Sequence, residues 1–387
     1  MKIVHIMPSA PYNDYWGYQD NLLPKYQKKL KHDVTVIATN TINKDGKISE
    51  IDCNDYVLND GVRVIRLKRK KYCCKVITNM RSKLEVYDLL CKINPDYIFF
   101  HGLVSSSIYD VVKYKKHRNC VVVQDNHIDY YNCAKTSKIK SLIIRFFYRR
   151  VVKKTVKYVD KVYGVTPWRQ KYAEEYFKVP KGKTDILIMG ADDEKIDFAH
   201  REIIRKNIRM NNDITDNDFL IVTGGKIDKA KNVIELMKAC ADLPNVKLLI
   251  FGSINADIKG EIDLILSKNK NIIYIGWISS DEVYDYFLAA DFVCFPGTHS
   301  VLWEQACACK VPCMFKRWPD MEHLDNGGNS VFVDNVTQMS LKESIKKYCF
   351  TENYYEIKKN ACSEKTDIYL YSKIAEKSLE VVRQKDE

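Results

Sequence analysis

Residues 295–312 read FPGTHSVLWEQACACKVP, and this stretch decides the fold that the sequence predicts. An apolar strand expected at Phe292–Phe295 runs into a Pro-Gly pair, which is typical of a turn. A helix is then expected to begin at Ser300, a good helix-capping residue, and to end near Lys310. A second short strand follows at Pro312–Phe315. The order strand, helix, strand predicts one repeat of an α/β layer with a parallel sheet.

The start of this helix has the chemistry of an anion site. The backbone N–H groups of Ser300, Val301 and Leu302 would be unpaired there, and the positive end of the helix dipole favours a phosphate. Glu304 lies one turn further on, where its carboxylate can accept hydrogen bonds from two sugar hydroxyls. A nucleotide would satisfy both features. The alternative is an ordinary strand–helix unit with a surface glutamate and a capping serine.

The composition predicts two domains with different partners. The chain has 387 residues, of which 46% are hydrophobic, and this is enough for two cores. Residues 1–190 carry 36 Lys and Arg against 18 Asp and Glu, a net charge of +18. Residues 191–387 carry 26 against 32, a net charge of −6. The basic half indicates an anionic membrane surface, phosphorylated ligands or nucleic acid.

The cysteines indicate reduced, buried thiols and a cytoplasmic protein. They form no C-x-x-C pair, and the one cluster near histidines fits no known zinc spacing, so no metal is expected. That cluster comprises Cys307, Cys309, Cys313, His299 and His323. A strand expected at Lys2–Met7 predicts that the chain has no secretory signal, and no apolar run is long enough to span a membrane.

Strands and helices alternate almost throughout, which predicts two doubly wound α/β domains. The boundary is expected near Gly190, where the charge balance changes sign. The first domain would cover residues 1–190 and the second residues 191–366. A last helix, over residues 367–387, is expected to pack back on the first domain.

Ligands of such sheets bind at the carboxyl ends of the strands. Gly17, after the first strand, could let the backbone approach a ligand, or it is an ordinary turn glycine. His127 follows the strand expected at Cys120–Gln124 and lies between two aspartates. It is placed for proton transfer, and a structural bond to a nearby loop carbonyl is an equal alternative. His101 also follows a strand, and a structural role is favoured for it.

Residues 138–157 contain eight basic residues and no acidic one, and they predict a helix with one core face. Three apolar residues interrupt the opposite, basic face, as expected of a helix that inserts among lipid headgroups. The predicted membrane contacts are Leu142, Ile143, Arg145, Phe146, Arg149, Arg150 and Lys153. The alternative is a solvated basic face whose apolar side chains touch the preceding loop. Nucleic acid is not expected, because no recognised nucleic-acid module is present.

The second half opens with a glycine turn and two cations. A strand ending at Thr223 is followed by Gly225, Lys226 and Lys231, a pattern suited to a diphosphate at the start of a helix. Neither the P-loop spacing nor G-x-G-x-x-G is present. A later turn with Gly276 and Trp277 could hold a flat nucleotide base.

Taken in order, these turns resemble the retaining GT-B glycosyltransferases of family 4, the glycosyl transferases group 1, including enzymes of cell-surface polysaccharide biosynthesis. The resemblance covers nearly the whole chain. Its strongest parts are Gly-Gly-Lys-x4-Lys ending at Lys231, Ile275-Gly276-Trp277, Ala290-Asp291 and residues 300–312. It implies two Rossmann-like domains that face each other across a cleft, with the acceptor in the first and a nucleotide-sugar in the second.

The resemblance also implies roles for individual residues. Lys226 and Lys231 match the family's diphosphate-binding pair, Glu304 its ribose-binding glutamate, and Gly276 with Trp277 its base-contacting turn. Gly17 matches the first-domain glycine loop, and His127 the active-site histidine near the donor sugar. One departure concerns the donor sugar: Pro296 stands where the family has a first glutamate. His299 or Ser300 could take its place.

The sequence therefore predicts a retaining, hexosyltransferase-type enzyme that needs no metal or cofactor. It would transfer a sugar from a nucleoside diphosphate sugar to a saccharide acceptor, lipid-linked and held at the inner face of the membrane. His127, Lys226 and Lys231 are the expected catalytic residues. A GT-B sugar-nucleotide epimerase and a catalytically silent membrane scaffold remain as alternatives. A dehydrogenase is disfavoured, because neither half carries G-x-G-x-x-G.

Overall fold

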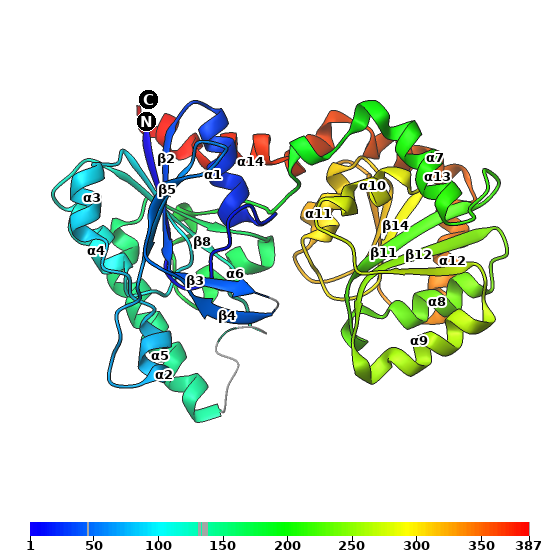
Figure 1. Ribbon diagram of the computed structural model, residues 1–387, viewed down its shortest axis with the longest axis horizontal. Helices are drawn as coiled ribbons and strands as arrows, with labels where there is room; N and C mark the ends of the chain where they lie inside the picture. Colours follow the sequence, from blue (N-terminus) through cyan, green and yellow to red (C-terminus); the bar gives the residue numbers. More distant parts are fainter. Residues whose placement is uncertain (45, 131–132, 134–137, 387) are drawn as a thin grey trace. The chain divides into compact units, whose positions relative to one another are not determined.

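A computed structural model describes residues 1–44, 46–130, 133 and 138–386. The chain divides into two compact units (Figure 1). The first unit comprises Met1–Met189 together with Ser372–Glu387, and the second comprises Gly190–Tyr371. Which unit holds the acceptor and which the donor stays a prediction, as does the cleft expected between them.

The first unit is built on a sheet with strand order β10-β9-β8-β7-β1-β2-β6-β5. Its strands pair in parallel except β5, which runs antiparallel to β6. The strands are β1 (Lys2–Met7), β2 (Asp33–Thr39), β5 (Asp55–Val57), β6 (Arg63–Leu67), β7 (Tyr97–Phe100), β8 (Val121–Asn126), β9 (Lys161–Gly164) and β10 (Thr184–Ile186). A separate hairpin joins β3 (Thr41–Lys44) and β4 (Lys47–Glu50).

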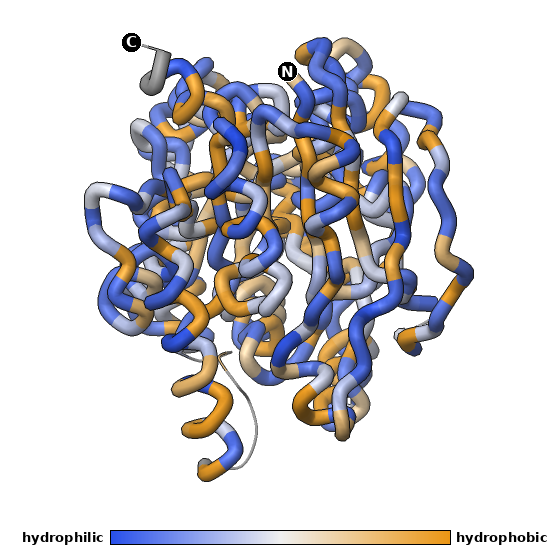
Figure 2. Tube along the Cα trace, turned by 90° about the vertical axis from the view of Figure 1, so that its left-hand side faces the viewer, coloured by the Kyte–Doolittle hydropathy of each residue, from blue (hydrophilic) through white to orange (hydrophobic). Residues whose placement is uncertain are grey.

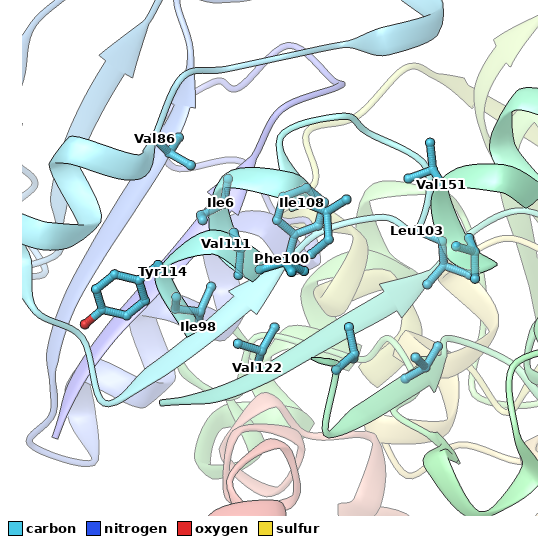
Figure 3. Packing of buried hydrophobic residues seen from close by; sticks show 14 of the residues in the cluster. Ile6, Val86, Ile98, Phe100, Leu103, Ile108, Val111, Tyr114, Val122 and Val151 are labelled. Atoms are coloured by element: carbon cyan, nitrogen blue, oxygen red, sulfur yellow. The ribbon is translucent and has the colours of Figure 1, made fainter. Parts of the chain in front are cut away.

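Helices cover both faces of this sheet, as parallel strands require. They are α1 (Gln19–Lys29), α2 (Lys75–Arg81), α3 (Tyr87–Ile93), α4 (Ile108–Lys115), α5 (Lys138–Thr155), α6 (Pro167–Glu175), α14 (Tyr371–Ser378) and α15 (Glu380–Asp386), with the 3₁₀ turns η1 (Val156–Tyr158) and η2 (Lys181–Lys183). Figure 3 shows the core, where Phe100 of β7 and Val122 of β8 pack with Ile108 of α4 and Val151 of α5.

The second unit holds a six-stranded, fully parallel sheet with order β13-β12-β11-β14-β15-β16. The strands are β11 (Phe219–Ile227), β12 (Val246–Ile254), β13 (Ile272–Gly276), β14 (Phe292–Phe295), β15 (Cys313–Lys316) and β16 (Ser330–Val333). The order reverses between β11 and β14, so this sheet has a topological switch point there. In doubly wound sheets, ligands bind at the carboxyl ends of the strands at such a point.

The helical segments of the second unit precede, connect and follow these parallel strands. They are η3 (Asp193–Lys195), η4 (Phe198–His200), α7 (Arg201–Asn211), η5 (Lys229–Lys231), α8 (Val233–Ala241), α9 (Ala256–Lys268), α10 (Glu282–Ala289), α11 (Leu302–Ala308), η6 (Glu322–Leu324), α12 (Gln338–Cys349), α13 (Glu352–Ala361) and η7 (Glu364–Tyr369).

The last part of the chain differs from the single helix expected over residues 367–387. Its first residues form η7, which belongs to the second unit. Leu370 then pairs with Ala191 in an isolated parallel bridge, and this extended residue interrupts the helix. The helices α14 and α15 follow in the first unit, where Tyr97 donates a hydrogen bond of 2.7 Å from its hydroxyl to the carbonyl of Ser378.

Candidate functional site

The strand β11 continues past the point where the sequence predicts a turn. It runs through both glycines to Ile227, because the glycines allow β11 and β12 to approach closely. A Cβ at Gly252 would lie 1.9 Å from the carbonyl oxygen of Gly225, and Gly225 itself has a φ of +106°. A Cβ at Gly225 would lie 3.0 Å from a methyl group of Leu302. The end of β11 therefore lies against the start of α11.

Lys231 joins the loop after β11 to the loop after β14. Its ammonium donates a hydrogen bond of 2.6 Å to the carbonyl of Thr298, and the amide of Thr298 donates one of 3.0 Å to the carbonyl of Ala230. A Cβ at Gly297 would lie 2.3 Å from the Cα of Lys231, so only glycine fits there. Burial lowers the pKa of Lys231, against the opposing influence of Asp228.

The other predicted cation, Lys226, is exposed on the last part of β11, paired in register with Ser253 of β12. An ammonium has three N–H donors, and the bond from Lys231 to the loop uses one of them. The two lysines therefore differ: Lys231 is half-buried and held by the fold, whereas Lys226 projects into solvent.

The helix α11 begins at Leu302, with Val301 as its N-cap residue, and not at Ser300 as expected. Ser300 instead lies in the loop, where its carbonyl accepts a hydrogen bond of 3.0 Å from the amide of Trp303. The bond between Thr298 and Ala230 holds the loop against η5, so the chain enters the helix later. The predicted anion site at the helix start thus moves to the turn at Val301.

Glu304 is fully buried, and two histidines bind its carboxylate. The Nε2 atom of His299 lies 2.8 Å and 3.0 Å from the two carboxylate oxygens, and Nε2 of His323 lies 3.1 Å from Oε1. Burial alone would raise the pKa of Glu304, but the charges and hydrogen bonds of the histidines outweigh it and lower the pKa to about 2. Glu304, the residue predicted to bind a ribose, is therefore already hydrogen-bonded to His299 and His323.

The same three residues have a geometry that could hold a metal ion. Within the described part of the chain, His299, Glu304 and His323 each offer one ligand atom, and these atoms lie within 4.8 Å of one another. Two imidazoles and a carboxylate are a ligand set found at catalytic zinc. The direct hydrogen bonds account for the same geometry without an ion. The expected absence of a metal stays a prediction.

Gly276 is the last residue of the edge strand β13 and Trp277 follows it, on the same edge of the sheet as the end of β11. Gly276 has a φ of +82°, a conformation that favours glycine, and a Cβ there would meet nothing within 4 Å. The side chain of Trp277 is 75% exposed, so its ring is open to a ligand.

In the first unit, His127 lies close to Asp125, one of the two aspartates that flank it in the sequence, and this aspartate is fully buried. The Nε2 atom of His127 lies 3.3 Å from Oδ2 of Asp125, and Nδ1 of His101 lies 2.9 Å from the same oxygen. Burial would raise the pKa of Asp125, but both histidines outweigh it and lower the pKa. Burial likewise works against charging His101, and Asp125 outweighs it to raise that pKa.

The network continues inward from His101 to the C-terminal helix. Nε2 of His101 lies 3.0 Å from Nδ1 of His5, and Nε2 of His5 lies 2.7 Å from the side-chain amide oxygen Oε1 of Gln27. Gln27 donates a hydrogen bond of 2.9 Å to the hydroxyl of Ser378. Burial, with His101, lowers the pKa of His5 to about 3. The sequence could identify members of this network only by their position directly after a strand. This applied to His101 but not to His5, which lies within β1.

Gly17 lies in the loop between β1 and α1, half-buried. Its φ is not positive, so the turn does not depend on glycine there. The loop is held by Arg66, which donates to Asp14 at 2.8 Å and to the carbonyl of Tyr12 at 2.8 Å. Sequence analysis missed this buried arginine, because a lone arginine within a strand carries no signal of its partner.

The predicted basic helix is present as α5, and the three apolar side chains that interrupt its basic face are exposed. Leu142, Ile143 and Phe146 are 71%, 59% and 67% exposed. Figure 2 shows hydrophobic turns at the projecting end of this helix. Arg145 donates a hydrogen bond of 2.9 Å to the carbonyl of Cys133, and Arg149 lies over the ring of Tyr176.

Arg150 and Lys153 are exposed on the same helix. In the part of the chain that the structure describes, no helix combines the length and the apolar character needed to cross a membrane.

One protein-family model matches within the second unit. Residues 204–365 match the family described as glycosyl transferases group 1. A curated relative, the alpha-galactosylglucosyldiacylglycerol synthase of Streptococcus pneumoniae, is 21% identical over 220 residues, which are 54% of this chain. The match spans 58% of that relative, so the chain corresponds to little more than half of its length.

Solved structures match over the full chain. Sucrose-phosphate synthase from Thermosynechococcus elongatus has a TM-score of 0.69 at 15% identity, covering 100% of this chain and 99% of that one. The Anabaena protein HepE in complex with UDP has a TM-score of 0.67 at 14% identity, covering 99% and 100%. Likeness at this identity shows the fold alone. The second unit thus resembles the glycosyl transferases group 1 over residues 204–365, and the chain as a whole has the GT-B fold with two Rossmann-like domains.

Proposed function

We propose that this protein is a retaining glycosyltransferase that transfers a sugar from a nucleoside diphosphate sugar to a saccharide acceptor. The observation that carries the proposal is the junction at the carboxyl edge of the second sheet. There Gly225, Lys231 and the first turn of α11 are held together, inside the range that matches the family. Sugar transfer leaves growing negative charge on the departing diphosphate, and this junction offers fixed donors for it.

Lys231 would bind the leaving diphosphate. It is half-buried, and burial disfavours its charged form. An anion beside it would favour the charged form, and the partial exclusion of water would strengthen the attraction between the ammonium and a diphosphate. Lys226 would approach from the solvent side as a second, more mobile cation. The HepE complex contains UDP, which supports a nucleoside diphosphate as the ligand class.

The histidines around Glu304 would complete the donor site in place of the family's first glutamate. His299 keeps part of its surface open, and Glu304 holds its ring in place. In this arrangement His299 contacts the donor sugar and Glu304 orients it. A carboxylate oxygen carries two lone pairs, so Oε2 retains capacity for a ribose hydroxyl. No metal is required in this proposal, because Lys226 and Lys231 supply positive charge to the diphosphate.

His127 would be the residue of the first unit that takes part in the reaction. Its ring is half-exposed beside fully buried Asp125, and an aspartate in that place fixes the tautomer and stabilises an imidazolium. The leaving phosphate itself would take the acceptor's proton. His127 then holds the donor sugar or the acceptor hydroxyl in position, and Asp125 acts through it.

The acceptor would be a lipid-linked saccharide at the inner face of the membrane, in glycolipid or cell-surface polysaccharide synthesis. The exposed apolar side chains and the cations of α5 support this, since such a surface inserts among anionic headgroups. The curated relative is named for a glycosylated diacylglycerol, which is consistent with a lipid acceptor.

The test is a screen of nucleotide sugars for thermal stabilisation and hydrolysis, repeated with Lys231→Ala. We expect the variant to lose about 10²–10³-fold in kcat, as when one preorganised donor to a developing anion is removed. Lys229→Ala is the matched control: Lys229 lies in the same turn, is exposed and pairs only loosely with Asp257 at 3.8 Å. Its activity should stay within about twofold of the parent.

Three outcomes would contradict the proposal. If Lys231→Ala and Glu304→Ala both bind the best ligand as well as the parent, the donor site is assigned wrongly. If the nucleotide sugar is epimerised without an acceptor, the protein is an epimerase. If no nucleotide sugar is turned over, it is a scaffold. Activity lost with a chelator and restored by a divalent ion would assign the His299, Glu304 and His323 group to a metal.

A further inference from the structure

A basic pocket of about 470 Å³ lies in the first unit, apart from the sites described above. It is formed by the segment after β6, by α2, by α4 and by the second half of α5. Five of its lining residues are cations: Lys70, Arg81, Lys83, Arg150 and Lys154.

Two of these cations are compensated and held in place. Lys70 pairs with Glu85 at 2.6 Å, and Lys83 pairs with Asp110 at 2.7 Å. For the other three cations, no carboxylate partner is present among the residues that the structure describes. The pocket therefore carries an excess of about three positive charges with no protein anion to match them.

Arg81 is fixed in this pocket by aromatic rings. Its guanidinium lies 4.8 Å from the ring centroid of Tyr72 and 6.0 Å from that of Phe147. Stacking leaves the edge N–H donors of a guanidinium free to point at an anion, in a geometry that suits phosphate oxygens. The pocket is thus preorganised for a small, doubly charged oxyanion. Preorganisation lowers the ordering cost of binding.

The position of the pocket on α5 indicates what carries this anion. Arg150 lies one turn after Phe146, which is about 6 Å along a helix axis. A lipid whose chains contact the exposed Leu142, Ile143 and Phe146 would thus place its headgroup beside the pocket. We propose that this pocket binds the dianionic phosphate of a membrane lipid. The inference rests on the proposed membrane contact of α5 and is independent of sugar transfer.

A phosphate monoester fits the charge of the pocket better than a phosphodiester. A monoester carries nearly two negative charges at neutral pH and offers three strong acceptor oxygens, whereas a diester carries one charge. General attraction to a charged surface does not distinguish the two when surface charge is equal. The pocket therefore predicts selectivity for phosphatidic acid over phosphatidylglycerol in vesicles of equal surface potential.

The experiment measures co-sedimentation of the full chain with phosphatidylcholine vesicles that contain either lipid. We expect the parent to bind the phosphatidic acid vesicles about tenfold more tightly, the effect of one charge-assisted hydrogen bond. Arg150→Gln with Lys154→Gln should abolish this preference. The control, Lys92→Gln with Lys140→Gln, removes two exposed charges outside the pocket and should keep it.

The outcomes separate the two proposals. If the parent binds neither vesicle, both the membrane contact and the lipid phosphate site are wrong. If it binds both vesicles equally, or if the pocket variant keeps the preference, the phosphate site alone is wrong. Calorimetry with sn-glycerol 3-phosphate in vesicle-free buffer identifies the source of the phosphate. Binding as tight as to phosphatidic acid vesicles would assign the pocket to a free phosphate and overturn the lipid assignment.

Discussion

Glu304 illustrates how a single side chain can be charged without contact with water. Burying an unpaired carboxylate costs far more than a fold can supply, so such a group is paired or neutral. Here two imidazoles approach the carboxylate, and the pKa of Glu304 is lowered to about 2. Because the folded pKa lies below the ordinary 4.5, the ionised group stabilises the fold above that pH. That stabilisation is lost as the pH falls towards 2.

Urea unfolding at a series of pH values measures how much the ionised Glu304 contributes to the free energy of unfolding. Between pH 4.5 and pH 2 the parent should lose up to about 3 kcal/mol of unfolding free energy through Glu304. Glu304→Gln carries no titrating group there, so its acid dependence should be shallower by that amount. Equal acid dependence in parent and variant would show that Glu304 is not held ionised by His299 and His323.

Asp125 is predicted to act as a positioning residue for His127. Asp125→Asn keeps the shape of the side chain but removes the charge that orients and stabilises the imidazolium. We expect kcat to fall about a hundredfold, with a smaller change in KM. The acid limb of the pH–rate profile should move to lower pH, because His101, which is bonded to the same carboxylate, loses the charge that raises its pKa.

A purely structural aspartate would behave differently. Asp125→Asn would then lower the thermal stability while the pH–rate profile kept its shape and position. His127→Gln is the companion variant: it should lower kcat to a similar extent, and the double variant should cost little more than either single one.

At the scale of single residues, the sequence predicted which positions follow the strands but not which residues they contact. Position after a strand was sufficient for His127, and the spacing of the family motif for Lys231. The partners could not be predicted, since Asp125 and His101 meet only when β7 and β8 pair. The partner of His323 could not be predicted either. In the sequence His323 belongs to a cluster of cysteines and histidines, but its bond to Glu304 forms because η6 lies against α11.

At the scale of elements, α5 has a surface that its own unit does not cover. Its core face buries Val151 and Val152, while an exposed apolar edge lies among cations. Transfer of a fully exposed aromatic side chain into an apolar phase is worth about 1.5–3 kcal/mol. Phe146→Ser should therefore weaken co-sedimentation with anionic vesicles by tenfold or more.

Ile48→Ser on β4 is the matched control, because Ile48 is equally exposed in the same unit but lies outside α5. It should leave vesicle binding unchanged. Equal losses in both variants, or no loss in either, would argue against insertion of α5.

The predicted bounds of an element were correct where they depend on its own residues. They were wrong where contacts with a neighbouring strand or loop extend or shorten the element. The strand at Phe292–Phe295 and the basic helix are where the sequence placed them. The end of β11 is not, because pairing with β12 extends the strand through two glycines that resemble a turn. The start of α11 is displaced for a similar reason: the loop before it is bonded to η5.

At the scale of the whole molecule, the C-terminal helices belong to the unit in which the chain begins. Ile374 and Leu379 are buried there, and Ser378 is bonded to Gln27 and Tyr97. The sequence predicted that the segment packs back, but it could not identify the partners, which lie some hundreds of residues earlier.

Ile374→Ala should therefore destabilise the first unit by about 2–5 kcal/mol, the cost of a cavity in a packed core. Ile368→Ala is the control, because Ile368 is exposed on η7, and it should change stability by less than about 0.5 kcal/mol. Urea unfolding of both variants is the measurement. Similar small changes in both would mean that α14 contributes little to the first unit.

The bridge between Ala191 and Leu370 has a consequence for the order of events on the ribosome. It joins the two ends of the second unit, so that every residue of this unit has been made before α14 leaves the exit tunnel. Domains fold as units during synthesis, usually the N-terminal one first. Here the second unit can fold while the first unit still lacks α14 and α15. The incomplete first unit is therefore the one that a chaperone would need to protect.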